Sequence, residues 1–291
     1  MTQIELVIDA KATLGEGPSW DHEKQVLYWV DILEKQIFIY DPESKYNRTI
    51  QLDHMPGAVV PREGGGLVAA LDNGFHFIDL DTEKNHLIHD PEEQIPTNRF
   101  NDGKCDPAGR FWAGTIDESR DKNAALYCLD TDLSVNEKID DVTNSNGLIW
   151  SFDHDYFYYI DTPTQKVVRY DYEMKTGAIK NPMDIIVVPD EQGKPDGMTI
   201  DADGMLWIAH WGGSKVSRWN PSTGDQIREI AVPALNITSC AFGGKDLNDL
   251  YITTARKGMN EEQLSDFPMA GGLFKVTMED VKGIPSSSYR G

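Results

Sequence analysis

The segment Asp196-Gly197-Met198-Thr199-Ile200-Asp201 decides the fold, because the same order of residue types returns along the chain. A polar residue stands before a glycine, a short strand-forming run follows, and an acidic turn ends the unit. The other copies are EGPSWD at residues 16–21, NDGKCD at residues 101–106 and NGLIWSFD at residues 146–153. A unit that recurs about every 45 residues is typical of solenoids, propellers and arrays.

Short runs rich in β-forming residues, bounded by Gly, Pro, Asn and Asp, fill the intervals, and helical periodicity is almost absent. The second strands of successive units begin at Leu27, Leu67, Phe111, Phe157, Leu206 and Leu250, at spacings of 40, 44, 46, 49 and 44 residues. A third strand and an outer fourth strand follow in most units. Six such units predict an all-β fold, a six-bladed β-propeller with four-stranded blades, as a single domain over residues 1–291. Residues 5–8 are expected to supply the outer strand of the last blade.

The residues that precede the four glycines are expected to meet at one mouth of the central channel. In a propeller the first strand of each blade lines that channel, and each blade is entered from the same face. The four residues are Glu16, Asp102, Asn146 and Asp196. The glycine after each one allows a close backbone approach or an unusual φ/ψ pair. Carboxylate and amide oxygens suit Ca²⁺, Mg²⁺ or Mn²⁺, and Zn²⁺ could also bind, so the sequence predicts one central divalent metal site.

Such a site indicates hydrolytic chemistry. An open metal site polarises a carbonyl and lowers the pKa of a bound water, and a carboxylate beside it can act as a general base. Arg99 and Asn101, which stand next to Asp102, add a cation and an amide that could orient an oxygen-rich substrate. His210 follows a strand and could reach the rim of the site from a loop.

Composition excludes several other classes of function. The net charge of −21, from 27 basic and 48 acidic residues, disfavours nucleic acid and an anionic membrane surface. The N-terminus has neither a basic region nor an apolar run, so no signal peptide is expected, and no stretch is long and apolar enough to span a membrane. Three widely spaced cysteines indicate reduced thiols and a cytoplasmic protein, and no obligate protein partner is evident.

Several motifs resemble the regucalcin (senescence marker protein) and gluconolactonase family. They are RFNDGK at residues 99–104, DPAGR at residues 106–110, SNGL at residues 145–148, PDGM at residues 195–198 and AGGLFKV at residues 270–276. The resemblance covers essentially the whole chain. It implies a six-bladed propeller that hydrolyses sugar lactones with one divalent metal ion.

The same resemblance assigns roles to particular residues. It implies that Glu16, Asn146 and Asp196 hold the metal, and that Asp196 also acts as the catalytic base. Arg99 and Asn101 are similar to the family's substrate-contacting pair. The repeat register points to Asp102 where the family pattern points to Asn101, and a β-bulge before Gly103 would reconcile the two.

The loop after Ala113-Gly114-Thr115 holds one further candidate. The family uses a glutamate there to contact the substrate, and an ungapped count places Ser119 at that position, one residue after Glu118. Glu118 is the expected substrate contact in this chain, with Ser119 as the alternative.

The expected activity is metal-dependent hydrolysis of sugar lactones such as gluconolactone to the aldonic acid. One alternative is a calcium-binding regulatory propeller without turnover, which would hold the same ligands. A second is an esterase or phosphotriesterase acting on a more apolar substrate, which an aromatic residue near the mouth, such as Trp211, would favour. A scaffold without catalysis is disfavoured by the paired carboxylates.

Overall fold

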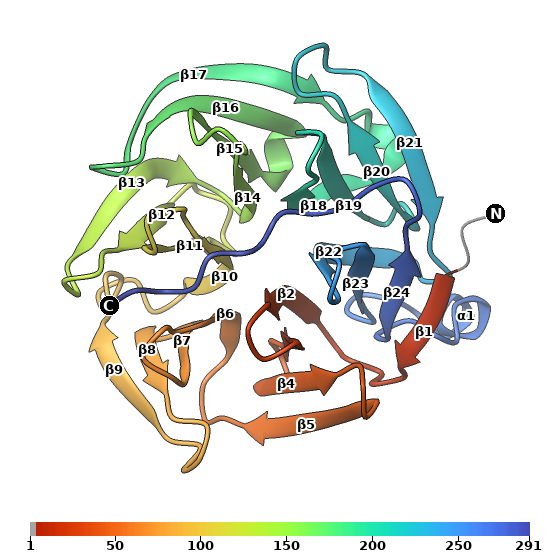
Figure 1. Ribbon diagram of the computed structural model, residues 1–291, viewed down its shortest axis with the longest axis horizontal. Helices are drawn as coiled ribbons and strands as arrows, with labels where there is room; N and C mark the ends of the chain where they lie inside the picture. Colours follow the sequence, from red (N-terminus) through yellow and green to blue (C-terminus); the bar gives the residue numbers. More distant parts are fainter. Residues whose placement is uncertain (1–3) are drawn as a thin grey trace.

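Six antiparallel sheets of four strands each surround a central axis in the computed structural model, which describes residues 4–291 (Figure 1). In five blades the strands run from the inner edge to the outer edge in chain order. The prediction of a six-bladed propeller with four-stranded blades is therefore confirmed.

The strand bounds follow the repeat closely. Blade 1 comprises β2 (Gly15–Asp21), β3 (Val26–Asp31), β4 (Gln36–Asp41) and β5 (Tyr46–Gln51). Blade 2 comprises β6 (Pro56–Pro61), β7 (Leu67–Leu71), β8 (Gly74–Ile78) and β9 (Asn85–His89). Blade 3 comprises β10 (Arg99–Cys105), β11 (Phe111–Ile116), β12 (Ala124–Leu129) and β13 (Val135–Val142). Blade 4 comprises β14 (Ser145–Trp150), β15 (Tyr156–Asp161), β16 (Lys166–Glu173) and β17 (Ala178–Val187). Blade 5 comprises β18 (Lys194–Ile200), β19 (Leu206–Trp211), β20 (Lys215–Trp219) and β21 (Gln226–Ala231). Blade 6 comprises β22 (Asn236–Gly243), β23 (Asp249–Ala255), β24 (Leu273–Thr277) and β1 (Ile4–Ile8).

The two ends of the chain close the ring. Strand β1 is the outer strand of blade 6 and pairs antiparallel with β24, with Ile4 opposite Val276 and Leu6 opposite Phe274. This confirms the expected role of residues 5–8. Closure by pairing strands from both ends hides two sheet edges that would otherwise be exposed.

The acidic turn of the repeat has a structural role. Asp106 and Asp201 directly follow the inner strands of blades 3 and 5. They accept hydrogen bonds from the indoles of Trp112 (3.0 Å) and Trp207 (2.8 Å). Each carboxylate also accepts two turn N–H groups and the guanidinium of an arginine. Buried carboxylates satisfied in this way lock the turn onto the blade core and are not available for catalysis.

The inner strands share an irregularity that shapes the channel mouth. In every one of the six, the register with the second strand shifts next to the repeat position. In β10 the shift lies between Phe100 and Gly103, so the predicted bulge is confirmed and both Asn101 and Asp102 lie within it.

The repeat glycines allow neighbouring inner strands to approach closely. A Cβ atom on Gly57 would lie 2.5 Å from the carbonyl oxygen of Phe100 in the next blade. One on Gly147 would lie 2.7 Å from the carbonyl oxygen of Asp196 in the next blade. The missing side chain, rather than an unusual φ, is what the channel requires at these two positions.

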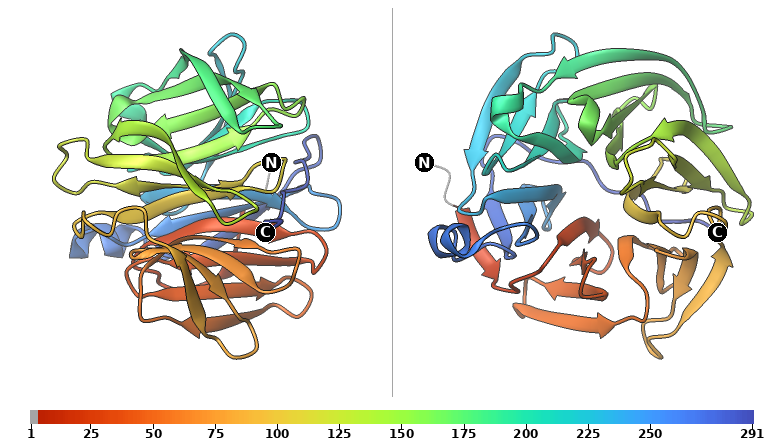
Figure 2. Two further views of the ribbon diagram at one scale, coloured as in Figure 1. Left: turned by 90° about the vertical axis from the view of Figure 1, so that its left-hand side faces the viewer. Right: turned by 180° about the vertical axis from the view of Figure 1, so that it is seen from behind.

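The chain after β24 forms a segment that we call the C-terminal strap, residues 279–291. It crosses in front of the inner strands in Figure 1 and lies behind them in the reverse view of Figure 2. Its anchor is Tyr289, which is fully buried, donates its hydroxyl to the carbonyl of Asp130 and bonds through its backbone to Pro61 and Glu63. The strap, together with Gly103 and Thr199, lines a small cavity. This cavity lies at one end of the inner strands, and Glu16 and Asn146 lie at the other end.

One short helix, α1 (Glu261–Asp266), lies between β23 and β24 and begins at an Asn260–Gln263 capping box. The repeat pattern did not predict it. Within residues 4–291 no helix is long and apolar enough to cross a bilayer. The three cysteines are buried free thiols, as expected.

Candidate active site

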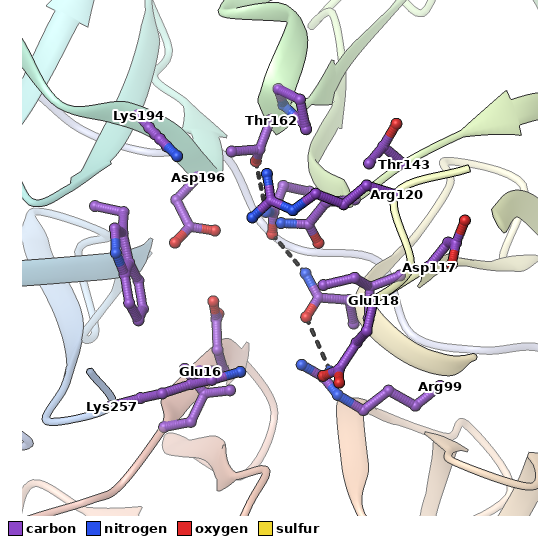
Figure 3. Close-up of a pocket in the computed structure, with 17 residues that line it drawn as sticks. Glu16, Arg99, Asp117, Glu118, Arg120, Thr143, Thr162, Lys194, Asp196 and Lys257 are labelled. Atoms are coloured by element: carbon purple, nitrogen blue, oxygen red, sulfur yellow. Dashed lines mark hydrogen bonds between the residues drawn. The ribbon is translucent and has the colours of Figure 1, made fainter. Parts of the chain in front are cut away.

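A cavity of about 390 Å³ opens at the channel mouth formed by the starts of the inner strands (Figure 3). Six of the residues that the sequence singled out line it: Glu16, Arg99, Asn101, Glu118, Asn146 and Asp196. They come from five segments of the chain, and the first and last of these residues are 180 positions apart. Of the four residues expected to meet at the channel mouth, Glu16, Asn146 and Asp196 line the cavity, and the expectation was wrong for Asp102.

Two carboxylates dominate the floor of this cavity. Glu16 and Asp196 point toward one another across it and are 3% and 5% exposed (Figure 3). Burial, and then the nearby Asp102, raise the pKa of Glu16 to about 8. Burial, and then the charges of Glu16 and Asp102, raise the pKa of Asp196 well above its usual value. Two desolvated carboxylates that repel each other are stabilised by a cation between them.

A chain of hydrogen bonds fixes the third candidate ligand. The amide of Asn146 donates to the hydroxyl of Thr162 (2.7 Å), which donates to the carbonyl of Pro195 (2.8 Å). On its other side Asn146 Oδ1 accepts from Asn101 Nδ2 (2.9 Å), which also donates to the carbonyl of Ser145. Asn146 Oδ1 therefore keeps one lone pair free for a further partner.

The donor set fits a hard divalent cation. Among residues 4–291 no three His, Cys, Asp or Glu side chains are grouped to hold a metal, so a bound ion would rely on Glu16, Asp196 and the amide oxygen of Asn146. Two carboxylates and one neutral oxygen, completed by water, are ligands that Ca²⁺, Mg²⁺ and Mn²⁺ accept. Zn²⁺ would find neither nitrogen nor sulfur there.

Asp102 lies deeper in the channel and does not line the cavity. Its carboxylate is 4% exposed, and burial raises its pKa while the charge of Lys104 opposes that rise. Lys104 in turn donates to the carbonyl of Met198 (2.8 Å). The bulge thus turns Asn101 toward the cavity and leaves Asp102 behind the acidic pair.

Arg99 stands at the edge of the cavity opposite Asp196. Its Nη1 donates to the carbonyl of Phe100 and to Asn101 Oδ1, both at 3.0 Å, and burial lowers its pKa. Both amide hydrogens of Asn101 are already donated. Asn101 can therefore only accept a hydrogen bond from a bound molecule, whereas Arg99 has further N–H groups to donate.

The loop between β11 and β12 brings Glu118 over Arg99 (Figure 3). Asp117 accepts the hydroxyl and N–H of Ser119 and the N–H groups of Asp121 and Asn123, which holds the loop together. Glu118 lines the cavity, whereas the hydroxyl of Ser119 is engaged with Asp117.

His210 does not reach the rim. It belongs to strand β19 rather than to a loop, is fully buried, and its Nε2 lies 2.5 Å from the hydroxyl of Ser217. Burial lowers its pKa to about 4, so it is a neutral core residue. The expectation that it lies in a loop was wrong because the strand continues through Trp211, which does line the cavity.

Several residues of the lining were missed in the sequence, among them Arg120, Thr162, Lys194 and Lys257. Three of these four lie in or beside connections, where no repeat register applies. Lys194 is the first residue of β18 and stands two residues before Asp196. Its position next to a predicted ligand could have indicated that it lies at the cavity.

Comparisons with known proteins identify relatives along the whole chain. Residues 14–256 match the family model described as the SMP-30/gluconolactonase/LRE-like region. The chain is 44% identical to the Bacillus subtilis (strain 168) protein YvrE, which is named as a candidate sugar lactone lactonase, over 94% of both chains. It is 42% identical to regucalcin of Danio rerio over 99% of both chains. A solved structure from Agrobacterium tumefaciens, described as a calcium-binding protein, regucalcin, superposes with a TM-score of 0.95 at 27% identity and covers 100% of this chain and 98% of that one.

Proposed function

Since the chain belongs to the SMP-30/gluconolactonase/LRE-like family, we propose that it hydrolyses sugar lactones to aldonic acids with the help of one divalent cation. The observation that carries this proposal is the pair of buried carboxylates, Glu16 and Asp196, facing one another beside Asn146. Arg99 beside them supplies a donor for an oxygen-rich substrate.

The cation would be held by Glu16, Asn146 and Asp196, and when bound it would supply Lewis-acid polarisation of the lactone carbonyl. Asp196 accepts the proton of the attacking water at its carboxylate. Arg99 donates to a ring or hydroxyl oxygen of the sugar, and Asn101 accepts from a sugar hydroxyl. Glu118, on its loop above Arg99, accepts from a second hydroxyl and covers the substrate.

The reaction consumes one water. The water oxygen bonds to the carbonyl carbon and the bond between that carbon and the ring oxygen breaks. The ring oxygen takes up the proton that Asp196 accepted from the water and becomes a hydroxyl. The resulting acid ionises at neutral pH, so each turnover releases one proton.

Proton release on a panel of aldonolactones tests the proposal. The protein is stripped of metal with a chelator and then refilled with Ca²⁺, Mg²⁺, Mn²⁺ or Zn²⁺ in turn. We expect hydrolysis above the spontaneous rate with at least one cation, and a loss of about a hundredfold or more in kcat for Asp196→Ala. Full activity in Asp196→Ala would contradict the assigned mechanism.

A calcium-binding protein without turnover is the second candidate, supported by the description of the Agrobacterium relative as calcium-binding. The same refilled protein distinguishes it. Tight Ca²⁺ binding by calorimetry together with no acceleration on any lactone would favour this candidate over the lactonase.

A further inference from the structure

The rim of the cavity carries three basic side chains that form no ion pair with any described residue. Arg120, Lys194 and Lys257 line it, from the β11–β12 loop, the start of β18 and the segment after β23 (Figure 3). Within residues 4–291 none of the three side chains forms an ion pair or a hydrogen bond. The chain has 48 acidic and 27 basic residues, so unpaired basic side chains gathered at one cavity are unexpected.

Several basic side chains elsewhere in the chain form ion pairs. Arg110 bonds to Asp106, Arg218 to Asp201 and Lys215 to Glu229. Each of these cations neutralises a carboxylate of the chain itself, whereas the rim cations remain available to a bound anion.

The acidic side chains of the cavity do not neutralise the positive charge of the rim. Glu16 and Asp196 face one another at the floor, where the proposed divalent cation would neutralise them. Asp117 is turned into its own loop, where it accepts the N–H groups of Ser119 and Asp121. Glu118 is then the one remaining carboxylate among the described lining residues, against Arg99 and the three rim cations.

Lys257 is the most confined of the three. Burial, and then the charge of Arg99, lower its pKa, and Glu118 opposes this only in part. An ammonium in that position gains from an added negative charge, because a partly desolvated ion pair is stronger than an exposed one.

The carboxylate that ring opening creates does not account for the rim. It forms at the lactone carbonyl, which the proposed function puts at the floor beside Glu16 and Asp196. Arg120, Lys194 and Lys257 reach the cavity from three different segments around it (Figure 3). Three cations in addition to Arg99 exceed the charge of one product carboxylate, which indicates a second negative charge on the substrate.

We propose that the lactone taken by this cavity carries a separate anionic substituent, a phosphomonoester or a carboxylate, which Arg120, Lys194 and Lys257 bind. This inference rests on the proposed lactonase function and narrows its substrate class. A charged substituent would also be attracted by the basic side chains of the rim as the substrate approaches.

The test compares kcat/KM for glucono-1,5-lactone, its 6-phosphate and a glucarolactone, with the cation that gives the highest rate. We expect an anionic lactone to be preferred by at least about tenfold, as a few charge-assisted hydrogen bonds would provide. The phosphate and carboxylate substrates show which of the two groups the rim accepts. A higher salt concentration should reduce the ratio of kcat/KM for the anionic lactone over the neutral one, because salt screens the charges.

Single variants locate the effect. Lys257→Gln, Arg120→Gln and Lys194→Gln should each reduce the ratio of kcat/KM for the anionic lactone over the neutral one, by about threefold to tenfold. Lys245→Gln, an exposed lysine outside the cavity, is the matched control and should leave the ratio unchanged. Hydrolysis of the neutral lactone with no anionic preference, or a ratio that the rim variants do not change, would overturn this inference and leave the lactonase intact.

A binding measurement keeps the two proposals separable. Calorimetry compares gluconate with gluconate 6-phosphate and glucarate on the cation-loaded protein and on Lys257→Gln. Tighter binding of gluconate 6-phosphate or glucarate than of gluconate, lost in the variant, supports the rim site even where no lactone is hydrolysed. Equal binding of all three acids in the absence of turnover would count against both proposals.

Discussion

At the scale of single residues, the orientation of Asn146 depends on Thr162. The threonine hydroxyl accepts from the Asn146 amide and donates to the carbonyl of Pro195, so it links β14 to the strand that carries Asp196. Neither bond involves a group expected to touch substrate. Partners of this kind fix the direction in which a ligand oxygen points.

Replacement of this hydroxyl should weaken cation binding. We expect Thr162→Val to reduce the affinity for the preferred cation by about tenfold, because Asn146 can then rotate away from the acidic pair. Calorimetric titration of the stripped protein measures the effect. Thr164→Val, which removes an exposed hydroxyl two residues away, should bind the cation as the wild type does. Wild-type affinity in Thr162→Val would show that Asn146 is held by its other contacts alone.

The raised pKa of Glu16 predicts how stability depends on pH without a cation. The folded protein holds a proton on this carboxyl up to about pH 8, whereas the unfolded chain releases it near pH 4.5. Stability from this group is therefore complete below about pH 4.5 and is lost as the pH rises toward 8. In chelator, the unfolding temperature should fall between pH 6 and pH 8.5.

The variant Glu16→Gln should show a smaller decrease in unfolding temperature between pH 6 and pH 8.5, because its side chain stays neutral at both pH values. Thermal unfolding in chelator at the two pH values measures it, with Glu93→Gln, an exposed glutamate, as the control. Added cation should reverse the trend in the wild type, since it displaces the bound proton and binds more tightly at higher pH. An identical pH dependence in Glu16→Gln and wild type would refute the assignment.

At the scale of the strands, the bulges explain how much of the site could be predicted. The repeat register located Glu16, Asn146 and Asp196, since one position of each inner strand is turned toward the channel mouth. In β10 the extra residue of the bulge determines that Asn101, and not Asp102, faces the cavity. A period counted along the chain cannot tell which of two adjacent side chains faces the mouth.

The glycines at the bulges lead to a separate prediction. Gly147→Ala would bring a Cβ within 2.7 Å of the Asp196 carbonyl oxygen and of Met198 Cβ, so β18 must move. We expect a destabilisation of about 1–3 kcal/mol, as is usual for overpacking, together with weaker cation binding. Urea unfolding and calorimetry measure the two effects. Gly64→Ala, where the nearest atom is a flexible arginine at 3.5 Å, should change neither.

Connections between strands were harder to predict than the strands. Glu118, Arg120 and Lys257 meet at the cavity because separate loops end above the same opening. No hydrophobic period fixes where such a loop places its side chains. Helix α1 was not predicted for a related reason. It has only six residues, which are too few to show a helical hydrophobic period.

At the scale of the whole molecule, the C-terminal strap links blades that no sheet joins. Tyr289 contacts β6 through Pro61, and the next residue bonds through its N–H to Gly109 in blade 3. The strap spans the end of the channel away from the cavity, as its shared lining with Gly103 and Thr199 indicates. It should therefore affect stability more than binding.

Variants of Tyr289 separate packing from hydrogen bonding. We expect Tyr289→Ala to reduce the free energy of unfolding by about 3–5 kcal/mol, since a fully buried aromatic side chain is lost. Tyr289→Phe keeps the ring and loses only the bond to Asp130, so it should cost about 1 kcal/mol. Guanidinium unfolding measures both, and cation affinity at 25 °C should stay near wild type in each. A large loss of affinity in Tyr289→Phe would mean that the two ends of the channel are coupled.

The pairing of β1 with β24 has a consequence for biosynthesis. Strand β1 must wait for a partner that is made about 270 residues later. Blades 1 to 5 can each assemble from contiguous chain as it emerges, whereas blade 6 cannot be finished before β24 has been made. Because contacts between distant residues form slowly, ring closure is the natural slow step of folding, and a prematurely terminated chain would remain an open arc with unpaired edges for chaperones and proteases to recognise.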